Sequence, residues 1–358
     1  MDMTAGGAPD AAPAGRQDTA AAPLRAARPH GAATDAAGIA VMACCAVWAL
    51  VAATGRPARP EGTLLALLAV AAGYAAGRIL GALLPVLAPA VAALAVLALV
   101  LVPPTRLSAR PDAPPLGYAN ADAALLVLAA GAACCAAWAC PGRVRRAGLR
   151  VVGAGAAVTA LALGSAAAFA AGVAVVLCSL AADLMRAHRL LGLAGLALAV
   201  TLAAGTSYAV AVNALPAGLT ESLTGQLTQP RVQLWHQAVT LAEHHPLRGV
   251  GPERFADESS ALPASGAPGA GSPQSAPLQV AAEQGLPGVA LLAAAYTWVL
   301  CALWRSSRST PVVLTAGAAL TGLAMLATVD HVLSYPVITA GAGFLAGVAT
   351  AQPLSTEP

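Results

Sequence analysis

Long runs of apolar residues without a charged side chain limit most strongly how this chain can fold. Of its 358 residues, 58% are hydrophobic and 10% charged, against about 25% charged in ordinary soluble domains. Several runs approach the roughly 20 residues that a helix needs to cross a bilayer. The sequence therefore predicts an all-α, polytopic transmembrane helix bundle of about 10 spans, with roughly 9 to 12 possible. The predicted spans are residues 36–54, 63–84, 86–102, 121–139, 148–163, 166–182, 190–212, 286–304, 311–329 and 332–350.

The placement of Arg predicts the topology of these spans, because basic residues in short loops favour the cytoplasmic side of a membrane. With the N-terminus inside, the outer short loops hold only Arg56, Arg59, Arg106 and Arg110. The inner side receives the other short-loop and tail arginines, namely Arg16, Arg25, Arg28, Arg143, Arg145, Arg146, Arg150, Arg186, Arg189, Arg305 and Arg308. We therefore expect a multi-pass protein with both termini in the cytoplasm.

This topology divides the chain into five parts. Residues 1–35, rich in Ala, Pro and Gly, are expected to form a disordered cytoplasmic tail. The first seven spans occupy 36–212, and residues 213–285 form one long extracytoplasmic loop. The last three spans occupy 286–350, and a short cytoplasmic tail follows at 351–358.

Two classes of partner find no support in the sequence. The arginines are scattered among loops instead of forming a basic face, which argues against nucleic acid. The seven cysteines lie inside or at the ends of apolar stretches, without the spacing of a zinc site or a disulfide framework. No metal is therefore predicted.

The long loop contains an amphipathic helix. Pro230 suits its first turn, and residues 231–244 place Trp235 and Val239 on an apolar stripe with Val232 and Ala242. Such a helix either lies on the bilayer surface or caps the bundle. Pro246 disfavours helical geometry at the residue before it, so the helix should end there.

Polar residues of the loop and of the outer span ends gather on one face of the predicted bundle. The glycines of "GVGPERF" are expected to make a tight turn that holds Arg248 and Arg254 near the membrane surface. "LQVAAEQGLPG" places Glu283 at the outer mouth of the eighth span, and Asp330 and His331 end the ninth. With Arg231 and His245, these residues suit an anionic, lipid-linked substrate.

The motifs in this region resemble those of the O-antigen ligase and O-antigen polymerase family. The resemblance rests on "RVQLWHQAVTLAEHHPLRGVGPERF" followed by "LQVAAEQGLPGVALL". "PLGYANADAALL" at 115–126 and "DHVLSYP" at 330–336 agree with it. It implies a polytopic protein of the bacterial cytoplasmic (inner) membrane that transfers a glycan from a polyprenyl diphosphate carrier to an acceptor hydroxyl, without a cofactor. Membrane lipid and envelope glycan assembly proteins are the other implied partners.

The resemblance also suggests roles for individual residues. Arg231 matches the family's loop Arg before the Trp, and Glu283 matches its Glu after Leu-Gln. Arginine guanidinium groups can hold a diphosphate, and a His or carboxylate can accept the proton of the attacking hydroxyl. The predicted substrate-binding residues are Arg231, Trp235, Arg248, Arg254 and Asp330, and the predicted catalytic residues are His245, His331 and Glu283.

Two departures from the family pattern leave alternatives open. Gln274 stands where relatives carry a His proposed as the base, and "LGSAAAF" at 163–169 lacks an Arg that many members have. The chain is then either a glycosyltransferase-type ligase or polymerase, or a non-catalytic relative that binds lipid-linked glycan within an envelope assembly complex. A solute transporter is less supported, because the spans contain few ionisable residues.

Overall fold

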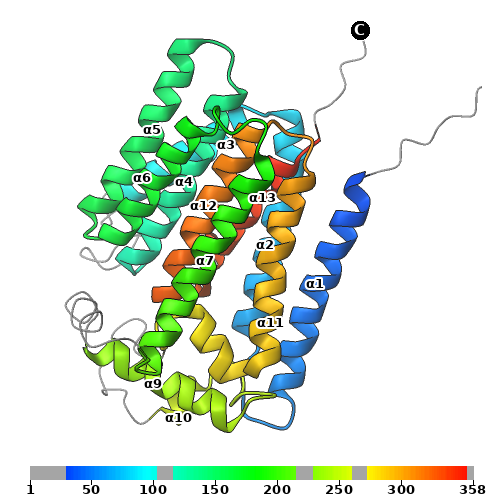
Figure 1. Ribbon diagram of the computed structural model, residues 1–358, viewed down its shortest axis with the longest axis vertical. Helices are drawn as coiled ribbons and strands as arrows, with labels where there is room; N and C mark the ends of the chain where they lie inside the picture. Colours follow the sequence, from blue (N-terminus) through cyan, green and yellow to red (C-terminus); the bar gives the residue numbers. More distant parts are fainter. Residues whose placement is uncertain (1–29, 103–115, 215–228, 260–271, 353–358) are drawn as a thin grey trace, which may run out of the picture.

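The computed structural model describes residues 30–102, 116–214, 229–259 and 272–352, and within them it is built entirely from helices (Figure 1). The expected tail at 1–29 lies outside the described residues. The α-helices are α1 (His30–Ala53), α2 (Glu61–Leu83), α3 (Leu87–Leu101), α4 (Ala119–Ala139), α5 (Arg143–Ala162), α6 (Ala166–Ala181), α7 (Arg189–Ala211), α9 (Gln229–His244), α10 (Phe255–Glu258), α11 (Ala276–Arg305), α12 (Thr310–Val329) and α13 (Pro336–Thr350). A short 3₁₀ turn, η2 (Val332–Ser334), lies between α12 and α13.

Each of the ten predicted spans overlaps an α-helix, which confirms the polytopic helical fold, although the last helix begins at Pro336 and not at residue 332. Six helices of the described chain are long and apolar enough to cross a membrane: α1, α2, α4, α7, α11 and α12. Helices α3, α6 and α13 are apolar but shorter. The predicted break at Gly164 and Ser165 is confirmed, because α5 ends at Ala162 and Ser165 caps α6 by accepting a hydrogen bond from the Ala168 backbone N–H. Helix α1 begins at His30, six residues before the predicted start of its span.

Helices α4 and α12 form the centre of the bundle. In the apolar stretch of each long helix, 94% of the residues are buried in α4 and 83% in α12. In α2 and α7, only 11% are buried. The outer helices carry exposed large apolar side chains, among them Ile39, Leu68 and Leu202. This pattern suits a bundle whose perimeter faces lipid, where exposed Leu and Ile carry no penalty.

Glycines bring α2 and α13 into direct backbone contact. A Cβ on Gly77 would lie 2.2 Å from the Phe344 carbonyl oxygen, and one on Gly347 would lie 2.3 Å from the Tyr74 carbonyl oxygen. Only Gly, which has no Cβ, lets the two helix backbones come this close. In a membrane such close packing is what stabilises helix association, because lipid provides no hydrophobic drive for it.

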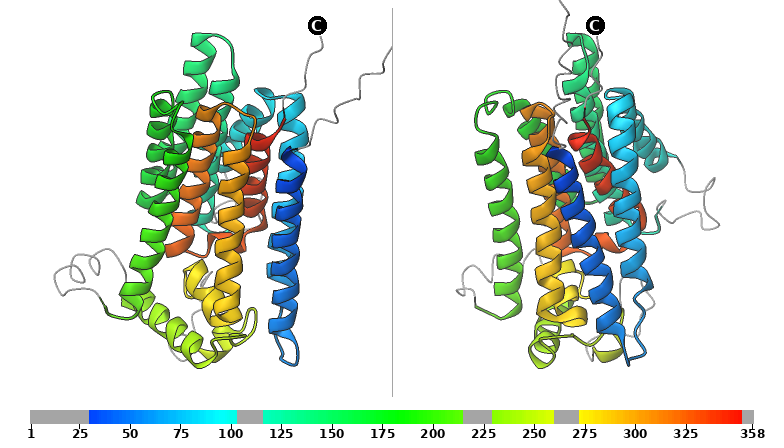
Figure 2. Two further views of the ribbon diagram at one scale, coloured as in Figure 1. Left: turned by 45° about the vertical axis from the view of Figure 1, so that its right-hand side comes forward. Right: turned by 90° about the vertical axis from the view of Figure 1, so that its right-hand side faces the viewer.

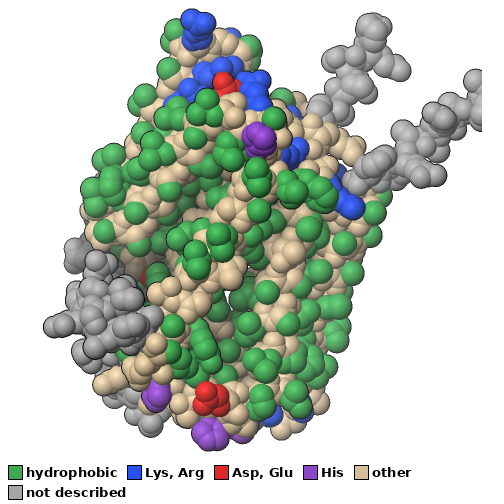
Figure 3. Space-filling view, in the orientation of Figure 1, with side chains coloured by type: hydrophobic (Ala, Val, Ile, Leu, Met, Phe, Trp, Pro, Cys, Tyr) green, Lys and Arg blue, Asp and Glu red, His purple; other side chains and the backbone are tan. Residues whose placement is uncertain are grey.

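The two ends of the bundle differ in chemistry. Helices α9 and α10 lie across one end, while α1 begins and α13 ends at the opposite end (Figures 1 and 2). Most Arg side chains visible in Figure 3 gather at the end that bears the C-terminus. The end covered by α9 carries the residues of the long loop.

Candidate functional site

The "PLRGVGPERF" turn binds α11 through backbone hydrogen bonds. The Val250 and Gly251 N–H groups donate to the carbonyl oxygens of Ala282 (2.8 Å) and Glu283 (2.9 Å), and Leu286 N–H donates to Pro246 O (2.8 Å). Gly249 (φ +58°) passes so close that a Cβ would lie 2.3 Å from the Glu283 carbonyl carbon. The predicted glycine turn is therefore present, and it holds the first turns of α11 in place.

Helix α11 bends where the turn meets it. Gly285 has φ 71° and ψ −170°, a conformation outside the helical range that glycine tolerates, and Pro287 follows within the helix. The segment before this bend packs under α9. The helical segment that carries Glu283 thus continues past Gly285 and Pro287 into the eighth span as one kinked helix.

Helix α9 caps the bundle through its apolar stripe. Trp235 is 1% exposed and packs with Val239, Phe255 and Leu278. Its indole Nε1 has no hydrogen-bond partner among the described residues. Trp235 is thus a core residue that packs α9 against α7 and α11.

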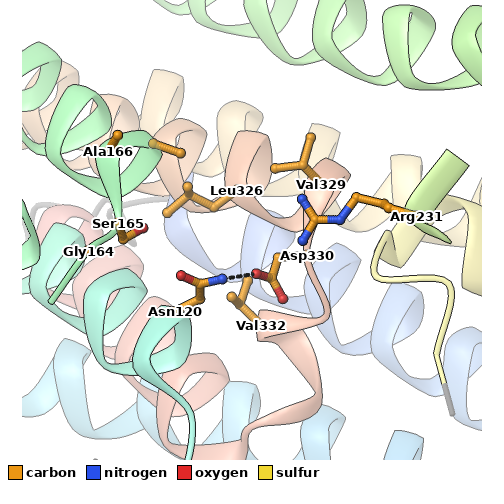
Figure 4. Close-up of a pocket in the computed structure, with 10 residues that line it drawn as sticks. Asn120, Gly164, Ser165, Ala166, Arg231, Leu326, Val329, Asp330 and Val332 are labelled. Carbon is orange, nitrogen blue, oxygen red and sulfur yellow. Dashed lines mark hydrogen bonds between the residues drawn. The ribbon is translucent and has the colours of Figure 1, made fainter. Parts of the chain in front are cut away.

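A cavity of about 190 Å³ lies beside the start of α9. Its wall combines the N-terminal ends of α4 and α6 with the C-terminal end of α12 (Figure 4). Arg231 and Asp330 line it from different elements, and Asn120 and Ser165 add polar atoms. The lining residues are Asn120, Gly164, Ser165, Ala166, Ala167, Arg231, Leu326, Val329, Asp330 and Val332.

Asp330 is the centre of a polar cluster at this cavity. The Tyr118 hydroxyl lies 2.9 Å from Asp330 Oδ2, and Asn120 Nδ2 donates to the same oxygen at 2.7 Å. The His331 backbone N–H donates to Oδ1 at 2.7 Å. His331 Nδ1 also lies 3.0 Å from Oδ1, although the alignment is not that of a hydrogen bond. Asp330 is only 5% exposed, so these donors replace most of its water.

The ionisation of this cluster follows from its contacts. Burial raises the pKa of Asp330, but the close contact with the His331 side chain and the hydrogen bonds from Tyr118 and the His331 backbone lower it by more, so the pKa lies below its ordinary value. Burial and the Asp330 charge raise the pKa of Tyr118 to about 12. Near neutral pH, Asp330 is therefore a carboxylate and Tyr118 a protonated donor.

Aromatic rings enclose His331 behind Asp330. Its ring centroid lies 4.8 Å from that of Tyr118 and 5.8 Å from that of Tyr335, and the residue is 6% exposed. The two tyrosine rings are stacked at 6.2 Å. The "GYANAD" run and the "DHVLSYP" run are thus in direct contact in the folded chain.

Arg231 is held toward the cavity by Gln274. Its Nε and one terminal nitrogen donate to Gln274 Oε1, at 3.0 and 2.8 Å. Gln274 has φ +51°, in the left-handed region, and its N–H donates to Ser272 Oγ at 3.1 Å. The Ser272 hydroxyl donates to Gln279 Oε1 at 3.2 Å, and Gln279 Nε2 donates to Glu283 Oε1 at 3.2 Å. A chain of hydrogen bonds therefore joins Arg231 to Glu283.

Six predicted site residues do not line this cavity: Trp235 and His331, described above, and Arg248, Arg254, Glu283 and His245. Arg248 donates to the carbonyl oxygens of Val51 and Thr54 (2.8 Å for the latter) at the end of α1, and Arg254 pairs with Glu258 at 2.6 Å. Glu283 is 5% exposed beneath the glycine turn. His245 is exposed, directly after α9. The roles assigned to these residues stay predictions.

Three residues at the site were not predicted as functional. Tyr118 and Asn120 belong to a run already noted for its family pattern, and that pattern was the available signal. Gln274 was noted only as a departure, because the sequence does not show that its amide faces Arg231. Across the described ranges, no group of three or more His, Cys, Asp or Glu residues could hold a metal ion.

Comparison with known families agrees with this arrangement. A family model described as O-antigen ligase matches residues 151–293, from within α5 to the middle of α11. The match includes Arg231, the glycine turn and Glu283, while the stretches around Tyr118 and Asp330 lie outside it. A search of curated proteins gave no match. The family match confirms the predicted resemblance to the O-antigen ligase family over residues 151–293, and the long apolar helices agree with a multi-pass membrane protein.

Proposed function

We propose that this protein transfers or polymerises a glycan from a polyprenyl diphosphate carrier onto an acceptor hydroxyl. The reaction takes place at the outer face of the bacterial cytoplasmic membrane, and both termini lie in the cytoplasm. One observation carries the proposal: a cation, Arg231, and a carboxylate, Asp330, line the same cavity. Glycosyl transfer needs both, one for the leaving diphosphate and one for the proton of the acceptor.

The diphosphate side of the site combines Arg231 with the start of α6. The first turn of a helix has unsatisfied N–H groups and a partial positive charge that favour phosphate. Gly164 and the small side chains that follow it leave this helix end open to the cavity. Arg231 uses two donors on Gln274, and a guanidinium has five, so it keeps donors for a ligand. Such donors stabilise the charge that develops on the departing diphosphate.

The acceptor side of the site centres on Asp330. The acceptor oxygen attacks the anomeric carbon, the bond to the diphosphate breaks, and the Asp330 carboxylate receives the hydroxyl proton. Tyr118 and Asn120 hold this carboxylate in one orientation. His331, next to Asp330 and predicted from sequence as a base, can stabilise or take up that proton. His245 and Glu283 have no part in this scheme.

The test is glycan transfer by the purified full chain, supplied with a polyprenyl diphosphate-linked oligosaccharide and a candidate acceptor. Arg231→Ala should lower transfer by about 10²- to 10³-fold, as loss of a donor to the developing charge does in other enzymes. Arg186→Ala is the matched control, because Arg186 is exposed and its side chain pairs with Asp183 in the same turn. Equal transfer by wild type and Arg231→Ala would refute the role of Arg231.

A non-catalytic role is the second candidate, and Gln274 favours it. This residue occupies the position of the family's proposed base, and an amide cannot accept the proton. Such a protein would bind lipid-linked glycan and pass it to other envelope assembly proteins. Donor binding without transfer to any acceptor, together with no gain on Gln274→His, would support this role. A gain in transfer on Gln274→His would exclude it.

A further inference from the structure

We infer that the opposite end of the bundle carries a second anion site, which binds the phosphate of an anionic phospholipid from the leaflet on that side. The site is a cavity of about 80 Å³ between the ends of α1, α2, α11 and α13. Arg78, Arg305 and Thr34 line it, together with Ser307 and Gln352. The inference is independent of the proposed transfer reaction, because the cavity lies at the other end of the molecule.

The cavity keeps a net positive charge. Asp35 neutralises Arg78, with Oδ1 3.0 Å from its guanidinium and 2.9 Å from the Tyr74 hydroxyl that also donates to it. Arg305 is exposed at the end of α11, and no hydrogen bond or ion pair engages its side chain in the described part of the chain. One guanidinium therefore remains for a ligand.

Neighbouring arginines remove the competing negative charge of the helix ends. The last carbonyl groups of a helix disfavour an anion. Arg189 donates to the carbonyl oxygens of Leu303 and Ser306 (3.0 Å for the latter), and Arg308 donates to that of Ala351 at 2.9 Å. The C-terminal ends of α11 and α13 are thus neutralised beside the cavity, and Arg305 is left to face an anion.

The cavity also has an unsatisfied hydroxyl. Thr34 Oγ1 is buried without a hydrogen-bond partner among the residues described, while Trp298 Nε1 holds the Thr34 backbone oxygen at 2.8 Å. Leaving a buried hydroxyl unpaired is unfavourable. A phosphate oxygen would accept from it.

A membrane lipid is the ligand that best suits this position. The flanking helices present apolar side chains, such as Ile79 and Leu80 of α2, which would contact acyl chains. Basic pockets between transmembrane helices at a membrane surface bind phosphorylated head groups. The shared chemistry is a phosphate oxyanion, which a free phosphate ion also offers.

Native mass spectrometry of the full chain in detergent, with added phosphatidylglycerol or phosphatidylcholine, tests the site. Wild type should retain phosphatidylglycerol preferentially, and Arg305→Gln should lower that retention about fivefold, as expected for one basic side chain near an anionic surface. Arg145→Gln, the matched control, removes an exposed Arg from the same end of the bundle and should retain the lipid as wild type does. Equal losses in the two variants, or no preference in wild type, would overturn the site.

Two further experiments control for misfolding of the variants and distinguish a lipid phosphate from a free phosphate ion as the ligand. Thr34→Val should lower lipid retention while leaving the melting temperature of lipid-free protein unchanged or higher, since the hydroxyl has no hydrogen-bond partner in the part of the chain that the structure describes. Retention unchanged by Thr34→Val would overturn the role of this hydroxyl. Inorganic phosphate that binds in an Arg305-dependent way, while phosphatidylglycerol does not, would overturn the lipid assignment.

Discussion

Gln274 Oε1 accepts two hydrogen bonds from the Arg231 guanidinium, at 3.0 and 2.8 Å. Gln274, one of the two departures from the resembled pattern, is therefore in contact with Arg231, a residue that matches that pattern. A neutral amide at this position orients Arg231 without cancelling its charge. At position 274 the chain therefore has a residue that holds Arg231 in place, instead of a residue that could act as a base.

The charge at position 274 should control donor binding. Gln274→Glu places a carboxylate on Arg231, and the resulting ion pair should lower affinity for a polyprenyl diphosphate donor on the order of tenfold. Gln274→Ala should have a smaller effect, because it frees the guanidinium without neutralising it. Donor titration by fluorescence or calorimetry measures both. Equal affinities for wild type and Gln274→Glu would show that Arg231 does not contact the donor.

Asp330 should affect transfer more than binding. Asp330→Asn keeps the shape of the side chain but removes the proton acceptor, so transfer should fall by about 10²- to 10⁴-fold while donor affinity changes little. Asp257→Asn on α10 is a suitable control, since Asp257 is exposed and lies 4.0 Å from Arg254. Parallel loss of binding and transfer in Asp330→Asn would indicate a structural role instead.

The Tyr118 hydroxyl should set the pH range of activity. Its hydrogen bond to Asp330 contributes to the lowered pKa of that carboxylate, so Tyr118→Phe should raise the pKa. The base is active only when ionised, and transfer is lost as pH falls through this value. The acidic limb of the pH–rate profile should therefore move to higher pH in Tyr118→Phe. Tyr208→Phe, which alters an exposed tyrosine of α7, should leave the profile of wild type intact.

The contact between α2 and α13 should limit stability. Gly77→Ala places a methyl group 2.2 Å from a backbone oxygen, and overpacking of this kind costs about 1 to 3 kcal/mol. Gly148→Ala in α5 meets nothing within 4 Å and should be neutral or slightly stabilising, because Ala favours a helix more than Gly does. Thermal unfolding in detergent compares the two variants. A melting temperature for Gly77→Ala at or above that of Gly148→Ala would contradict the packing described here.

The sequence by itself determined where the helices lie. Each of the ten predicted spans overlaps an α-helix, and the end of α9 at His244 and the break at Gly164 were also predicted, whereas the kink at Gly285 lies inside one continuous helix. These features are local, because helix hydrogen bonds join residues four apart and the breaker residues act within one turn. Apolar length then decides which helices can cross a bilayer.

Only the tertiary structure decided which polar residues meet. Tyr118 and Asp330 are 212 residues apart in the chain, and the packing of α4 against α12 brings them within hydrogen-bonding distance. Trp235 lies in the core at 1% exposure, and Arg248 is engaged at the end of α1. The sequence does not show these surroundings, and the substrate-binding roles predicted for both residues stay predictions. Hydropathy places all of these residues at one end of the bundle. The contacts among them depend on the rotation and close packing of helices, which no local pattern encodes.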